Sequence, residues 1–135
     1  MKHLVFSLIL IMIAGNLSGC VSEPLRTEKV RDLTFVVLAE EEIPKELLGQ
    51  IEKKKEQAFR MSYEDKGVLY IAEGYGTQPK TGYSVEAVEV FEAENAVYFH
   101  THLMGPEKGE EVEETPTFPY IVIATETVGK NVVFD

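Results

Sequence analysis

The hydrophobic pattern changes its period partway along this chain, and that change limits the possible fold more than any other feature. Ile43, Leu47, Leu48 and Ile51 recur at the spacing of one face of a helix. From about Phe59 onward, apolar residues recur at every second position, as they do in strands with one buried face. The pattern therefore predicts an α+β domain with one amphipathic helix near its N-terminal end.

Several segments have the β-branched and aromatic composition of strands. One precedes the helix and the others follow it: residues 33–39, 68–75, 83–92, 96–104, 118–125 and 131–134. We expect them to form an antiparallel sheet, folded as a small barrel or a sandwich, that carries the helix.

Two of these strands, on either side of Glu94-Asn95, are expected to form a hairpin. A two-residue loop there pairs Val90 with Phe99, whereas a four-residue loop pairs Val88 with Phe99. Both registers keep apolar side chains on one face and polar side chains on the other, as a half-buried antiparallel pair requires.

The first twenty residues do not belong to this domain. An apolar run over residues 4–14 is too short to cross a bilayer, which takes about 20 residues, and has the length of a signal-peptide core. Residues 17–20 (LSGC) follow it and resemble the lipobox of bacterial and archaeal lipoproteins. A lipobox needs a thiol at its last position because that thiol receives a diacylglyceryl group.

Cys20 is the only cysteine of the chain and stands at that position. The alternative is an ordinary secretory signal in which Cys20 is incidental. The lipobox predicts residues 1–19 as a lipoprotein signal peptide, 20–32 as a lipidated tether and 33–135 as the folded domain. We therefore expect the protein to be anchored by lipid in the cell membrane and to face outside the cytoplasm.

Charge and cysteine content exclude several classes of protein. The chain has 13 Lys and Arg against 23 Asp and Glu, a net charge of −10, which argues against binding to nucleic acid. One cysteine allows no internal disulfide and no cysteine-rich zinc module. The chain also lacks a G-x-S-x-G motif and a phosphate-binding loop. We expect neither enzymatic activity nor a cofactor.

Two polar features could bind a cation, but each has a simpler interpretation. His100 and His102 are predicted on one face of a strand, yet zinc needs three or four ligands and no further His or Cys accompanies them. Residues 105–117 contain five Glu and one Lys but lack the ligand pattern of an EF-hand. We predict no metal site, two surface histidines and a solvated, mobile acidic loop.

The segment of residues 74–85 (GYGTQPKTGYSV) is the best candidate for binding a partner. Its glycines permit backbone angles that other residues avoid, and Pro79 fixes one further angle. The loop is therefore partly ordered before binding and loses less conformational entropy when it contacts a partner. Tyr83 offers a large amphipathic surface of the kind enriched at interfaces. The alternative is a tight connection between strands, with Tyr83 packed in the core.

The same segment, followed by a long hairpin and TFPYIVIA, resembles the C-terminal domain of the PrcB family over residues 68–134. The matching residues are Gly76, Pro79, Thr81, Gly82, Tyr83 and Pro119-Tyr120. The family pattern is close to P-T-G-G-Y, whereas this chain has Lys80 before the Thr and a single Gly. The family is named for a lipoprotein subunit of a bacterial protease complex, so the resemblance implies a non-catalytic protein that assists or stabilises an envelope protease.

The Thr-Gly-Tyr turn also resembles the T-G-[FY] loop of chagasin-type inhibitors of cysteine proteases, which implies inhibition as an alternative function. Two further alternatives are a lipoprotein that binds a small ligand or metal and a purely structural envelope protein. Our principal hypothesis is an accessory domain whose partner-binding loop consists of Gln78, Pro79, Lys80, Thr81, Gly82 and Tyr83.

Overall fold

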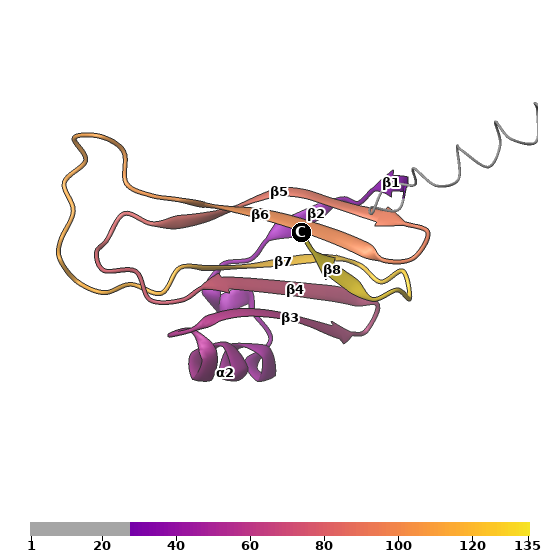
Figure 1. Cartoon of the computed structure of the whole chain (residues 1–135). Helices are drawn as coiled ribbons and strands as arrows, with labels where there is room; N and C mark the ends of the chain where they lie inside the picture. The colour runs from indigo at the N-terminus through magenta and orange to yellow at the C-terminus, as the bar shows by residue number, and fades with distance from the viewer. Residues whose placement is uncertain (1–27) are drawn as a thin grey trace, which may run out of the picture.

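The structure is a computed structural model that describes residues 28–135. It consists of two four-stranded sheets that face each other and one helix on the outer side of the second sheet (Figure 1). The predicted signal peptide at residues 1–19 and the lipidation site at Cys20 lie outside the described residues. No helix in the described part of the chain is long and apolar enough to cross a membrane.

Sheet A has the strand order β1-β5-β6-β8. Its strands are β1 (Lys29–Asp32), β5 (Ser84–Ala93), β6 (Val97–Met104) and β8 (Val132–Phe134). The β5–β6 hairpin turns at Glu94-Asn95, with Val90 opposite Phe99, so of the two registers left open by the sequence the two-residue one is formed. A bulge at Val88 interrupts the pairing of β5 with β6. β8 pairs with β6 in parallel, so this sheet is mixed rather than purely antiparallel.

Sheet B has the strand order β2-β7-β4-β3 and is antiparallel throughout. Its strands are β2 (Phe35–Val37), β3 (Ala58–Asp65), β4 (Val68–Tyr75) and β7 (Tyr120–Glu126). The β3–β4 hairpin turns through Lys66 and Gly67, which have φ of 50° and 80°. Two positive φ angles in a two-residue loop identify a type I′ turn, whose twist matches that of the strands.

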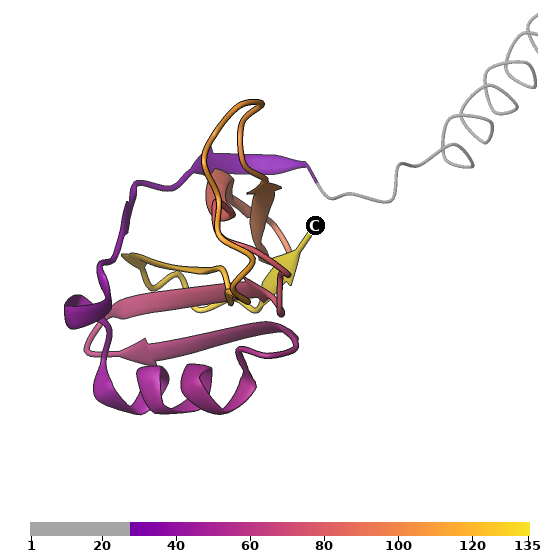
Figure 2. The same cartoon turned by 90° about the vertical axis from the view of Figure 1, so that its left-hand side faces the viewer.

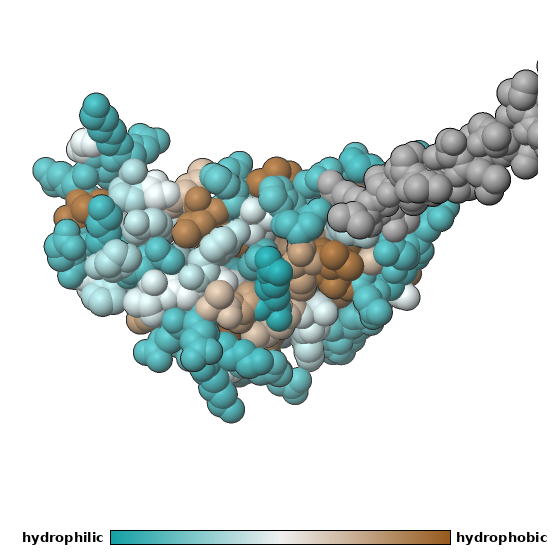
Figure 3. Space-filling model, viewed as in Figure 1, coloured by the Kyte–Doolittle hydropathy of each residue, from teal (hydrophilic) through white to brown (hydrophobic). Residues whose placement is uncertain are grey.

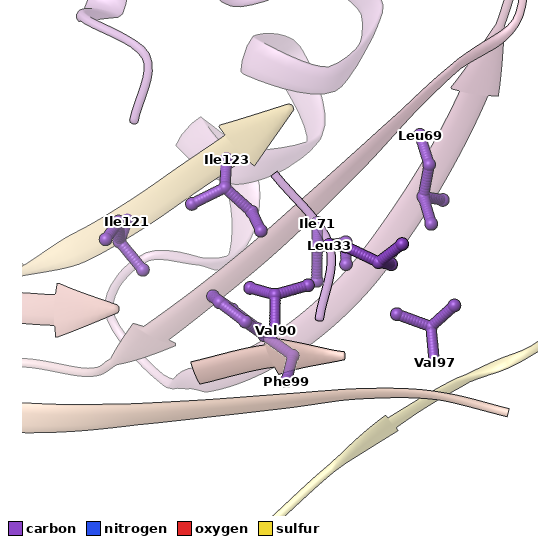
Figure 4. Packing of buried hydrophobic residues seen from close by; sticks show 8 residues of the cluster. All are labelled: Leu33, Leu69, Ile71, Val90, Val97, Phe99, Ile121 and Ile123. Carbon is purple, nitrogen blue, oxygen red and sulfur yellow. The ribbon is translucent and has the colours of Figure 1, made fainter. Parts of the chain in front are cut away.

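The main core lies between the two sheets. Its fully buried side chains come from both sheets and from Leu33, where the chain crosses from β1 in sheet A to β2 in sheet B. Figure 4 shows these side chains pointing toward one another: Leu33, Leu69, Ile71, Val90, Val97, Phe99, Ile121 and Ile123. The predicted sandwich is confirmed by this arrangement, and the described strands do not close into a barrel.

A second core lies between the outer face of sheet B and helix α2 (Lys45–Lys54), which Figure 2 shows packed beneath β3 and β4. Leu47 and Ile51 are buried, as their helical spacing predicted. The helix begins after Pro44 and ends near Lys53 and Lys54, whose charges suit the C-terminal end of its dipole. A single 3-10 turn, η1 (Glu40–Glu42), connects β2 to the helix.

The sequence interpretation was wrong about where the folded domain begins. Residues 29–32 were placed in the tether, but they form β1 and pair with residues 91–93 of β5. Their four side chains are all exposed, so the strand carries no apolar pattern. It is held instead by backbone pairing and by Arg31, which forms ion pairs with Glu92 and Glu126.

Candidate functional site

Two loops leave the sandwich at the same end and lie side by side (Figure 1). The first loop, residues 76–83, connects β4 to β5 and contains all of the predicted partner-binding residues. The second loop, residues 105–119, connects β6 to β7 and contains the acidic run. We call the two together the two-loop tip.

The two loops are joined by backbone hydrogen bonds. The N–H of Gln78 donates to the carbonyl of Thr117 over 2.8 Å, and the N–H of Thr117 donates back over 3.0 Å. The side-chain hydroxyl of Thr117 donates to the carbonyl of Lys80 over 2.9 Å. The sequence analysis treated the loops as separate features, whereas the structure brings them together in one unit.

Thr81 makes a second connection further out. Its N–H donates to the carbonyl of Glu113 over 3.0 Å, and its side-chain oxygen accepts a hydrogen bond from the N–H of Glu113 over 2.9 Å. The backbone N–H and the side-chain oxygen of Thr81 therefore both bind the backbone of Glu113, and this pair of hydrogen bonds fixes the two loops to each other at this point.

Gly82 allows the loops to approach closely. Its φ is +96°, in the region that side chains rarely adopt, and a Cβ on it would stand 2.8 Å from Cβ of Pro106. A side chain here would be strained and would push the second loop away. Gly82 is thus required by the contact between the loops.

The structure divides the predicted partner-binding residues into two groups. Gln78, Thr81 and Gly82 hold the two loops together. Pro79 is exposed, and the side chains of Lys80 and Tyr83 are only half-buried. The Tyr83 ring lies close to Gly105 and is not packed in the core between the sheets. Pro79, Lys80 and Tyr83 are therefore the members of the set whose side chains are at least partly exposed and take no part in the hydrogen bonds between the loops.

The surface of the tip is acidic and hydrophilic. Figure 3 shows mostly hydrophilic side chains at this end of the molecule. All of the acidic residues of the second loop are exposed: Glu107, Glu110, Glu111, Glu113 and Glu114. The solvation predicted for this loop is confirmed, while its backbone is tied to the first loop. A partner that docks here meets a surface of net negative charge that also includes Lys80 of the first loop.

A groove of about 340 Å³ begins beside the tip, on the side of β2. Tyr83 and Val85 line one wall, and Val37, Tyr120 and Ile121 contribute to the other. Burial raises the pKa of Tyr120, and the carboxylates of Glu40 and Glu52 raise it further. The phenol of Tyr120 therefore stays neutral at physiological pH. Among the described residues that line the groove, Glu40 is the one that carries a charge, and most of the others are apolar.

The sequence analysis missed a buried polar network just inside the sandwich. Glu73 is 5% exposed; it accepts hydrogen bonds from the Thr101 hydroxyl over 2.7 Å and from Nε of Arg60 over 3.0 Å. The Tyr75 hydroxyl lies 2.6 Å from the Thr101 oxygen. Because Thr101 has one hydroxyl proton and gives it to Glu73, Tyr75 must donate to Thr101.

This network connects the core to the tip. Tyr75 is the last residue of β4, and Gly76 begins the first loop. Arg60, Glu73 and Tyr75 also line a pocket of about 350 Å³ at the edge of sheet B. Alternation along β4 could have revealed the network, since it places Glu73 on the same face as the buried Leu69 and Ile71.

The two histidines lie on the outer face of sheet A, as predicted, together with Tyr98. His102 is exposed, and Nδ1 of His100 lies 2.7 Å from the backbone oxygen of Asp135. Glu89, opposite His100, is 3.3 Å from the ammonium of Lys29. Within residues 28–135, no group of three or more His, Cys, Asp or Glu side chains is placed to hold a metal ion.

The chain enters the domain at the end opposite the tip. β1 pairs with the last residues of β5, next to the hairpin, whereas the tip lies beyond the first residues of β5 (Figure 1). β5 has ten residues, and a strand rises about 3.3 Å per residue, so roughly 30 Å separates the two ends.

Comparison with models of known protein families yields a match. Residues 69–126 match the family described as PrcB C-terminal. The matched region includes Glu73, Tyr75 and Thr101 of the buried network, the first loop, the β5–β6 hairpin and the second loop. No curated protein and no solved structure matches the chain.

Proposed function

We propose, from the membership of this chain in the PrcB C-terminal family over residues 69–126, that it is a non-catalytic subunit that assists or stabilises a protease at the cell envelope. The family match supports the general role in a protease complex. The contact surface proposed for the protease is the two-loop tip. The accessible side chains that carry this contact are Pro79, Lys80 and Tyr83, on a loop held in place by Gln78, Thr81 and Gly82.

The observation that carries the proposal is the position of the tip relative to the start of the described chain. If Cys20 is lipidated, the membrane lies on the side of β1. The residues between Cys20 and residue 28 span at most about 28 Å when fully extended. The tip then points away from the bilayer, where an envelope protease can reach it.

Affinity capture from native membrane extract tests this proposal. The full chain, purified in detergent, is compared with a Lys80→Glu/Tyr83→Ala double variant, which changes two accessible side chains and leaves the hydrogen bonds between the loops. Gly82 is left unchanged, because a side chain there would disturb the loop contact itself. We expect the wild-type chain to retain a protease and the double variant to lose most of it.

Lys53→Glu is the matched control, since it makes the same change in charge on the exposed surface of α2, away from the tip. It should capture the protease as the wild type does. Equal capture by the wild type, the double variant and the control would show that the tip is not the surface that binds the protease. The activity of the captured protease separates the two protein-binding alternatives, because an accessory subunit preserves or raises it and an inhibitor lowers it.

A further inference from the structure

The two sheets both have an unpaired edge on the side of the groove. β1 pairs only with residues 91–93 of β5, and the N–H of Leu33 donates to the carbonyl of Val90. Over residues 84–88, no described strand pairs with this side of β5. β2 is likewise the edge strand of sheet B. Unpaired strand edges present backbone N–H and C=O groups that can pair with another extended chain.

Apolar side chains are exposed along the same open side. Val37 of β2 and Val88 of β5 are 57% and 52% exposed. Between the two edges lies the groove, whose lining includes Leu38, Val85 and Ile121. Its volume of about 340 Å³ falls at the lower end of the range for ligand pockets, roughly 300–1,000 Å³. An open edge beside an apolar groove fits a strand that alternates apolar side chains with polar ones.

The charges around the groove select among the possible occupants. Glu40 lines it and Glu41 and Glu42 follow in η1, while Glu86 lies exposed on the open stretch of β5, on the face opposite Val85. A second copy of this chain would bring the same carboxylates together, and each copy carries a net charge of −10. Like charges placed opposite one another in a sheet are destabilising, so an occupant with basic residues is favoured.

We propose that this side of the molecule binds an extended segment of a partner protein, apolar at alternate positions and flanked by Lys or Arg. The segment adds as a strand to residues 84–88 of β5 and places its apolar side chains in the groove against Val37, Val85 and Tyr120. Only the identity of the partner in this proposal, a protease, rests on the proposed function. The binding chemistry itself depends on the edge, the groove and its acidic rim.

A synthetic peptide tests the binding mode without any protease. The probe has about ten residues, in which Val and Thr alternate between Lys residues at both ends, and a second peptide carries Glu in place of Lys. Binding to the full chain in detergent is measured by calorimetry, and amide exchange of residues 84–88 is followed by mass spectrometry. We expect the Lys-flanked peptide to bind more tightly and to slow exchange over these residues.

Two neighbouring valines of β2 provide a matched pair of variants. Val36 and Val37 are each 57% exposed, but Val37 lines the groove and Val36 lies on the opposite face of the strand. Val37→Lys should weaken binding about tenfold or more, and Val36→Lys should leave it unchanged. Unchanged exchange of the β7 amides in both variants establishes that sheet B is intact.

The proposal is overturned if both variants bind alike, if the Glu-flanked peptide binds as well as the Lys-flanked one, or if binding leaves exchange of residues 84–88 unchanged. Formation of a dimer through this edge, detected by light scattering and lost in Val37→Lys, would also overturn it in favour of a second copy. Failure of the protease capture with intact peptide binding would reject the proposed function alone.

Discussion

The same two strands build very different interiors at the two ends of the sandwich. Toward the hairpin end, Leu69 and Ile71 of β4 face Val97 and Phe99 of β6, and all of them are buried and apolar. Toward the tip, the next inward positions are Glu73 and Tyr75 on β4 and Thr101 on β6, which form a hydrogen-bonded network.

This difference separates stability from positioning. Apolar burial is the main source of folding free energy, and it is non-directional. A hydrogen-bonded network adds little net stability but fixes the directions of the groups that form it. Here the network ends at Tyr75, immediately before the first loop. We therefore expect the hairpin half to determine whether the domain folds and the tip half to determine how its loops are placed.

The largest expected effect comes from the apolar half. Phe99→Ala removes a fully buried ring that lies against Phe134 and should lower the free energy of unfolding by about 3–5 kcal/mol. Urea denaturation followed by circular dichroism measures the change. If the variant remains folded, amide exchange in the tip should change no more than global destabilisation requires. A loss below about 1 kcal/mol would contradict the assignment of stability to this half.

Substitutions of Glu73 should have intermediate effects and should separate stability from positioning. Glu73→Ala leaves a cavity and removes the acceptor of Thr101 and Arg60, so the free energy of unfolding should fall by about 1–3 kcal/mol. Glu73→Leu fills the space with an apolar side chain and avoids the cavity, but it still removes the acceptor of Thr101 and Arg60, so it should lose less stability than Glu73→Ala. Denaturation curves of the two variants measure both effects.

The positioning role predicts a second readout for Glu73→Leu. Although it avoids the cavity of Glu73→Ala, this variant should exchange faster at the amides of the first loop than its loss of global stability requires, because Tyr75 loses the fixed Thr101 that orients it. Tyr75→Phe, which removes only the donated hydrogen bond, should show the same change to a smaller extent. Unaltered loop exchange in both variants would make the network a purely structural feature.

Period and composition were sufficient to predict most of the fold. The helix over residues 45–54 and most of the strands that bury side chains follow from the apolar pattern, because burial of one face is what that pattern encodes. The pattern left both hairpin registers open, and β3 was not among the predicted strands. β1 could not be predicted in this way, since none of its side chains is buried. The division of the strands into two sheets depends on contacts between distant segments, which local periodicity does not report.

The candidate site was predicted only in part. Residues 78–83 were identified from their glycines, Pro79 and Tyr83, but the sequence did not indicate that Thr81 and Gly82 bind the second loop. That contact joins Thr81 to Glu113 across the whole β5–β6 hairpin, and nothing in either segment encodes its partner. The role of Glu73 could have been predicted from the sequence, because a carboxylate that faces inward among apolar residues needs a hydrogen-bonding partner.

The smallest expected effect concerns a charge at the hairpin end, which lies outside the core instead of inside it. Glu92 is 2.6 Å from Nζ of Lys130 and 2.9 Å from Nε of Arg31, and it links β5 to β1 and to the segment before β8. Hydrogen bonds from Lys130 and then Arg31 hold the pKa of Glu92 below its ordinary value of about 4.5. A carboxylate with a lowered pKa in the folded state stabilises the protein above its ordinary pKa and loses that contribution as the pH falls through the lowered value.

Glu92→Gln should therefore unfold at a slightly lower urea concentration than the wild type at pH 7, and the difference should disappear as the pH falls below about 4.5 toward the folded-state pKa. Salt should also reduce the difference at pH 7, because the ion pairs are near the surface. Loop exchange at the tip should be unchanged, in contrast to Glu73→Leu. A change in the tip would show that the two ends are coupled through β5, and the division between a stabilising half and a positioning half would then fail.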